Sequence, residues 1–202
     1  MSTKIPTKAM TFATQITLFR LLLVPVFCVL AVQYAVTVEA GFPEEHLRWF
    51  AIGVYILAAA LDGLDGWVAR NFHQKSLMGS ILDPLTDKAL LLSGLITMTL
   101  VDWGQDWHLP MWFLVLVIIR DTEIIVGIWI LYFINRRVPI NPHWTGKVCT
   151  VTQMIALGWV MLKLFNIPTV IPTIIAAVFT VWSGIAYFQE GLRQLRELER
   201  AS

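Results

Sequence analysis

The chain has 202 residues, of which 57% are hydrophobic and 14% charged, and its mean hydropathy of +0.68 is too high for an ordinary soluble domain. A formal net charge of +1 argues against a nucleic-acid partner, because such binding needs a concentrated basic surface and the fifteen Lys and Arg residues are spread over the chain. Cys28 and Cys149 lie far apart in apolar stretches, without metal-site spacing, and are interpreted as small core residues. We therefore expect a single integral membrane domain over residues 1–202, without a nucleic-acid partner.

Six apolar stretches follow the short basic N-terminus, and each is long enough to cross a hydrocarbon layer of about 30 Å. Their predicted ranges are 13–37, 49–69, 80–101, 111–134, 146–165 and 169–188. Turn and interface residues separate them, as in GFPEEH at 41–46. The tail beyond the last stretch carries Glu and Arg in pairs, which indicates a last helix that continues into water. The predicted fold is all-α, with six transmembrane helices.

Basic residues predict the orientation of these helices. The N-terminus, the second and fourth loops and the tail contain nine of them: Lys4, Lys8, Arg70, Lys75, Arg136, Arg137, Arg193, Arg196 and Arg200. In the other three loops, Arg48 is the only Lys or Arg residue. Because loops rich in Lys and Arg stay on the cytoplasmic side, we expect both termini to be cytoplasmic, and the even number of spans agrees with this orientation.

Four acidic residues lie at predicted membrane depth, where a carboxylate requires a partner or a polar cavity. Asp62 and Asp65 end the second stretch, and Asp83 and Asp87 begin the third. Spacings of three and four place each pair on one helix face, and the short connection predicts an antiparallel hairpin. Four converging carboxylates repel one another unless cations neutralise them. All-oxygen ligands favour two Mg²⁺ or Mn²⁺ ions, held by Asp62, Asp65, Asp83 and Asp87.

Two other interpretations of these acids remain open: salt bridges to nearby Arg and Lys residues, or an ion-coupled carrier. The small residues Gly66, Ala69 and Gly79 lie beside the acids. They would let a bulky ligand approach the helix backbone, or let helices pack closely. A carrier has no need for small residues at these fixed positions, so the spacing favours an enzyme.

The complete pattern resembles the signature of the CDP-alcohol phosphatidyltransferase family. It reads Asp62-Gly-Leu-Asp65-Gly66-Trp-Val-Ala69-Arg70, eight residues, Gly79, three residues, Asp83, three residues and Asp87. The resemblance implies six helices, usually in a homodimer, around a polar cavity that holds two metal ions and opens to the cytoplasm. It also implies an enzyme of the bacterial inner membrane, with its active site on the cytoplasmic side.

The resemblance also implies roles for single residues. Asp62, Asp65 and Asp83 would ligate metal, and Asp87 would complete the metal site and act as the catalytic base. The CDP-lipid site would be formed by Asp62, Gly66, Ala69, Arg70 and Gly79. The substrates implied are CDP-diacylglycerol and a polar or phosphorylated alcohol, with CMP as the leaving group.

The acceptor alcohol must be inferred from other polar residues at membrane depth. Arg20, Arg120 and Lys147 are candidates for binding an acceptor phosphate. Arg20 and Lys147 are also near enough to the predicted surface to snorkel, and Arg120 is also able to form a structural ion pair with Asp121 or Glu123.

The segments at 17–27 and 146–154 resemble the branch of the family that uses glycerol 3-phosphate. Cys149 occupies a place where that branch commonly has a second lysine, and Asp121 one where it commonly has Glu. The Arg120-Asp121 pair, with the segment QKSLMGSILDPLTDK, also resembles cardiolipin synthases, which use phosphatidylglycerol. We favour glycerol 3-phosphate over phosphatidylglycerol, followed by inositol phosphate or serine.

Overall fold

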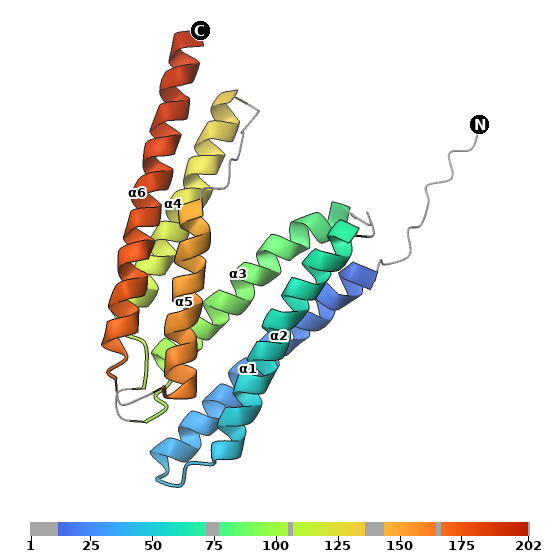
Figure 1. Cartoon of the computed structure of the whole chain (residues 1–202), viewed down its shortest axis with the longest axis vertical. Helices are drawn as coiled ribbons and strands as arrows, with labels where there is room; N and C mark the ends of the chain where they lie inside the picture. The colour runs from blue at the N-terminus through green and yellow to red at the C-terminus, as the bar shows by residue number, and fades with distance from the viewer. Residues whose placement is uncertain (1–11, 72–76, 105–106, 136–143, 165–166, 202) are drawn as a thin grey trace, which may run out of the picture. The chain divides into compact units, whose positions relative to one another are not determined.

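The computed structural model of the protein describes residues 12–71, 77–104, 107–135, 144–164 and 167–201 (Figure 1). Side chains are described for these residues except 12–17, 62–71, 77–87, 128, 131–132, 134–135 and 197–201. The described residues form six helices: α1 (Phe12–Glu39), α2 (Glu45–Asn71), α3 (Leu77–Leu100), α4 (Met111–Asn135), α5 (Trp144–Leu162) and α6 (Val170–Ala201). The all-α prediction is confirmed, and α6 continues through the charged tail as expected.

Within the described residues, three helical stretches are long and apolar enough to cross a membrane. They are Leu18–Glu39, Trp144–Leu162 and Val170–Arg196. Many apolar side chains on the helices are exposed, including Leu22 and Val178. Such a surface is unfavourable in water but favourable in hydrocarbon, so it agrees with a membrane protein. The crossing of all six helices and a cavity open to the cytoplasm remain predictions.

The helices divide into two compact units, residues 1–97 and residues 98–202. In the first unit, α1 and α2 pack side by side as an antiparallel hairpin (Figure 1). The Phe27 and Tyr55 rings meet between the two helices, with 5.1 Å between their centroids. Ala31 of α1 is fully buried, and a side chain this small lets membrane helices approach closely.

The α1–α2 turn begins with a Schellman motif, which satisfies the last carbonyl groups of α1. The Gly41 N–H donates to the Val38 carbonyl at 3.1 Å, and the Phe42 N–H donates to the Thr37 carbonyl at 3.1 Å. Gly41 has a φ of 80°, in the left-handed region that the motif requires and that glycine adopts without steric cost.

We expect Gly41→Ala to destabilise the protein by about 1 kcal/mol, because a Cβ makes the left-handed conformation unfavourable. No neighbouring atom lies within 4 Å of the added Cβ, so crowding would not contribute. The measurement is thermal unfolding in detergent. Gly53→Ala is the control: Gly53 is helical and its Cβ would also meet open space. That change should stabilise the helix by about 0.5–1 kcal/mol. A loss of stability in both variants would contradict the explanation.

A cluster of polar contacts connects the start of α2 to α1. The Tyr34 hydroxyl donates to Glu45 at 2.9 Å, and Glu45 forms an ion pair with Arg48 at 2.8 Å. The Arg48 guanidinium also lies 5.2 Å from the centre of the Trp49 ring. Together with the Schellman motif, these contacts fix how the chain leaves α1 and enters α2.

In the second unit, α6 packs against both α4 and α5. Its buried face carries small side chains, including Ala176, Thr180 and Ser183. Small side chains permit close helix packing in membranes, and hydroxyl groups add hydrogen bonds between helices. Cys149 of α5 is buried and free, so its interpretation as a small core residue is confirmed.

Candidate functional site

The four signature acids lie on helical backbone. Asp62 and Asp65 belong to the last part of α2, and Asp83 and Asp87 belong to the first part of α3. Helical geometry therefore places each pair on one face of its helix, as predicted. The five residues between the helices keep their ends within roughly 20 Å of each other, because a chain of that length reaches no further.

The convergence of these acids on metal ions stays a prediction, because their side chains lie outside the described ones. The same holds for Gly66, Ala69, Arg70 and Gly79. Where side chains are described, no group of three or more His, Cys, Asp or Glu residues is placed to hold a metal ion.

The three candidates for acceptor binding have different surroundings. Lys147, in the first turns of α5, is exposed. Arg20 is fully buried in α1, so its interpretation as a snorkelling side chain is wrong. Arg120 is 6% exposed, in α4. A buried arginine requires specific partners, and those of Arg120 are well defined.

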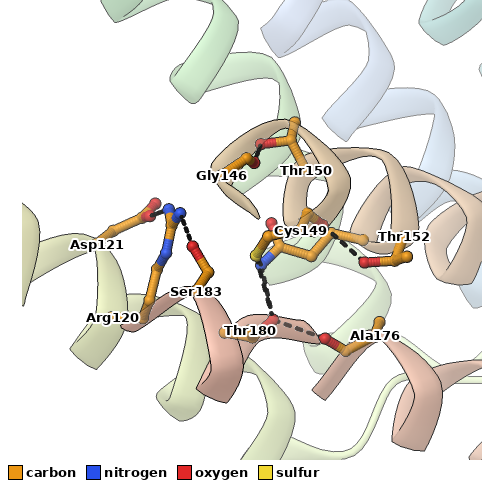
Figure 2. A network of polar contacts seen from close by, with 10 residues as sticks. Arg120, Asp121, Gly146, Cys149, Thr150, Thr152, Ala176, Thr180 and Ser183 are labelled. Carbon is orange, nitrogen blue, oxygen red and sulfur yellow. Dashed lines mark hydrogen bonds and ion pairs between the residues drawn. The ribbon is translucent and has the colours of Figure 1, made fainter. Parts of the chain in front are cut away.

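Arg120 forms the centre of a polar cluster in the second unit (Figure 2). Its Nη1 donates to Asp121 Oδ1 at 2.8 Å, and its Nη2 donates to Ser183 Oγ at 2.6 Å. The guanidinium carbon lies 5.5 Å from the centre of the Tyr187 ring, a cation–π distance. The ion pair is thus contained in α4, and the contacts that link two helices are those from Arg120 to Ser183 and Tyr187 of α6.

Two glycines bring backbone close to charged side chains of α4. A Cβ on Gly146, in the first turn of α5, would lie 2.9 Å from the Tyr187 hydroxyl oxygen and 3.4 Å from Arg120 Nη2. A Cβ on Gly184 of α6 would lie 3.0 Å from Glu123 Oε2. Both positions are thus tightly packed, and a larger residue at Gly146 would displace its neighbours.

Hydrogen bonds between polar side chains connect α5 and α6 beside the Arg120 cluster (Figure 2). Gln153 Nε2 donates to Thr180 Oγ1 at 3.1 Å and to Cys149 Sγ at 3.2 Å. The Thr180 hydroxyl donates to the Ala176 carbonyl at 2.7 Å. Position 149, where a second lysine is common in the branch that uses glycerol 3-phosphate, therefore carries a neutral thiol within helix packing.

A cavity of about 460 Å³ lies along α4 and α6. Its polar lining includes Arg120, Glu123, Thr180 and Gln189. Its apolar lining consists of Leu116, Ile119, Val181, Ile185, Phe188 and Leu192. Much of this apolar lining is exposed, so the cavity is an open groove. An apolar wall with a few polar groups suits an amphipathic ligand.

Comparison with known proteins identifies the enzyme class. The family model for CDP-alcohol phosphatidyltransferase matches residues 10–182. The chain belongs to this family. The match includes the whole signature from Asp62 to Asp87, so the resemblance inferred from the motif is confirmed, and the interpretation as an enzyme is confirmed over that as a carrier.

Bacterial members of the family align over most of the chain. A protein of Mycobacterium tuberculosis named "Probable phosphatidylglycerophosphate synthase" is 32% identical over 187 residues, covering 91% of this chain and 82% of the relative. A Haemophilus influenzae protein named "CDP-diacylglycerol--glycerol-3-phosphate 3-phosphatidyltransferase" is 30% identical over 181 residues, covering 86% and 89%. An Escherichia coli protein of the same name is 30% identical over 182 residues, covering 86% and 91%.

The sequence pattern does not single out Ser183, Tyr187 or Gly146. Hydroxyl residues and glycines are common at packed surfaces of membrane helices, so their presence alone carries no functional signal. The one sequence feature that could have pointed to these residues is their spacing. Thr180, Ser183 and Tyr187 are three and four residues apart, which places them on one face of α6.

Proposed function

We propose that the protein transfers a phosphatidyl group from CDP-diacylglycerol to glycerol 3-phosphate. The acceptor hydroxyl oxygen would attack the β-phosphorus of the CDP-lipid and form the new P–O bond. The bond between that phosphorus and the CMP oxygen would break, and the hydroxyl proton would pass to Asp87. The products are phosphatidylglycerophosphate and CMP. The observation that carries the proposal is the complete signature within a chain that aligns with relatives named for this reaction.

Asp62, Asp65, Asp83 and Asp87 would hold two Mg²⁺ or Mn²⁺ ions. The helical backbone supports this assignment, because each pair of acids shares one helix face, and carboxylate oxygens suit these cations. The ions, when bound, would neutralise the pyrophosphate and stabilise the leaving oxygen. Gly66, Ala69 and Gly79 would leave room for the nucleotide, and Arg70 would bind its phosphates.

Arg120 would bind the phosphate of the acceptor. Three observations on its side chain support this role: it is buried, it lines the cavity along α4 and α6, and it is a cation at predicted membrane depth. A guanidinium recognises a phosphate through paired N–H donors. Lys147 is exposed and would add positive charge for attracting the anion, and Arg20 stays a further candidate for the same role.

The test is CMP release by the purified protein in detergent, with CDP-diacylglycerol, Mn²⁺ and one acceptor at a time. We expect release with glycerol 3-phosphate, and loss of release when EDTA removes the metal. Phosphatidylglycerol is the competing acceptor, because it is the substrate of the cardiolipin branch that Arg120-Asp121 resembles. Release with phosphatidylglycerol but not with glycerol 3-phosphate would overturn the acceptor assignment, and activity that persists in EDTA would overturn the metal assignment.

A further inference from the structure

We propose that Ser183, Tyr187 and Gly146 are positioning residues, which hold the Arg120 guanidinium in the orientation that binds the acceptor phosphate. The inference rests on the proposed function, because it assumes that Arg120 binds the acceptor. It adds residues from α5 and α6 that belong neither to the signature nor to the predicted acceptor site.

The contacts of Arg120 leave part of its guanidinium for a ligand. An arginine has five N–H donors, and Asp121 and Ser183 accept one hydrogen bond each. The Nε of Arg120 is buried and has no hydrogen-bond partner within the part of the chain that the structure describes. A buried donor without a partner is costly, so a binding anion that accepts from this edge gains affinity.

Ser183 and Tyr187 constrain the guanidinium in two different directions. The hydrogen bond to Ser183 Oγ, at 2.6 Å, holds Nη2 from the α6 side. The Arg120 guanidinium carbon lies over the Tyr187 ring, 5.5 Å from the ring centre. A guanidinium that is hydrogen-bonded at one nitrogen and attracted by an aromatic ring has less freedom to turn, so its remaining donors keep a preferred direction.

Gly146 sets the position of Tyr187. A Cβ at residue 146 would lie 2.9 Å from the tyrosine hydroxyl oxygen and 3.3 Å from its Cε2. The absence of a side chain at Gly146 therefore makes room for the tyrosine hydroxyl, and an added methyl group would push the ring away from its place beside Arg120. This contact links the first turn of α5 to the orientation of Arg120.

A double-mutant cycle tests this link. Gly146→Ala should raise the KM for glycerol 3-phosphate at least about threefold, because the added methyl group displaces Tyr187. Tyr187→Phe removes the hydroxyl oxygen but keeps the ring, so its own effect on KM should be smaller. The double variant should bind the acceptor better than Gly146→Ala alone, because it lacks the tyrosine hydroxyl oxygen, which is the atom nearest to the added methyl group. The KM for CDP-diacylglycerol should not change in any variant.

A second pair of variants tests the hydroxyl contact. Ser183→Ala should raise the KM for glycerol 3-phosphate several-fold, through loss of the hydrogen bond to a charged group. Thr173→Val is the matched control on α6, because the Thr173 hydroxyl is also buried but donates to the carbonyl of Thr169, the residue just before the helix. That control should leave the KM unchanged. KM does not depend on the fraction of folded enzyme, so partial misfolding would not imitate the effect.

The outcomes separate the inference from the proposed function. If the wild-type protein releases no CMP with glycerol 3-phosphate, the proposed acceptor is wrong and the inference fails with it. If the wild type uses glycerol 3-phosphate, two results overturn the inference alone: a KM increase for both substrates in Gly146→Ala, or no relief of the acceptor KM by Tyr187→Phe.

Discussion

Asp87→Asn should lower the rate of CMP release by about 10²- to 10⁴-fold, the contribution that a positioned general base typically makes. The amide keeps the shape of the side chain but accepts no proton from the acceptor hydroxyl, and it is a weaker ligand for a divalent cation. Because the residue lies on helical backbone in α3 and the substitution is nearly isosteric, membrane insertion and yield should stay the same. The measurement is CMP release with Mn²⁺ and glycerol 3-phosphate at saturating concentrations.

The matched control is the same chemical change at Asp102, which lies in the loop after α3. Asp102 is exposed, and its carboxylate accepts a hydrogen bond from the Gly104 N–H at 3.1 Å. An asparagine oxygen can accept the same bond, so Asp102→Asn should retain the wild-type rate. A rate near that of the wild type in Asp87→Asn, with metal supplied, would remove Asp87 from the catalytic site.

Arg120→Lys should raise the KM for glycerol 3-phosphate by at least about 30-fold, because loss of one partner from a buried charged hydrogen-bond pair costs about 2–5 kcal/mol. Lysine keeps the charge, but a single ammonium cannot reproduce the planar fork that contacts Asp121 and Ser183. The KM for CDP-diacylglycerol should remain unchanged, since the signature residues that would bind it are intact. Steady-state kinetics with each substrate varied in turn measure both values.

Arg193→Lys is the control for this substitution. Arg193 lies on α6, has a side chain that is 66% exposed, and pairs with Glu190 at 3.0 Å. An exposed pair of this kind contributes little, so neither KM should change. Equal increases in both KM values for Arg120→Lys would instead indicate a general distortion of the α4–α6 packing, and would remove Arg120 from the acceptor site.

The helices of this fold were predictable because the membrane imposes a strong pattern. An apolar run of about 20 residues predicts a long helix, and the predicted stretch at 111–134 agrees closely with α4 at Met111–Asn135. The charged end of α6 was also predictable, because its Glu and Arg residues are spaced for pairing along one helix. The Glu190–Arg193 ion pair confirms that spacing.

The partners of Arg120 were less predictable, because they depend on how helices distant in sequence pack. The sequence places Asp121 and Glu123 near Arg120, but it contains no signal that Ser183, 63 residues later, accepts one of its hydrogen bonds. The burial of Arg20 was not predictable from the sequence for the same reason. Its place near the end of an apolar stretch suits a snorkelling side chain, yet tertiary packing buries it completely.

The antiparallel hairpin of α1 and α2 has an electrostatic consequence. Arg20 lies 22 residues before Phe42 in the turn, and Asp62 lies 20 residues after it. Since both helices rise by about 1.5 Å per residue, the backbone of the first signature acid reaches nearly the same level of the hairpin as the buried guanidinium. If the signature carboxylates converge as predicted, a permanent positive charge at that level would reduce their mutual repulsion. Arg20 would then supply the predicted acidic site with a counter-charge from the chain itself.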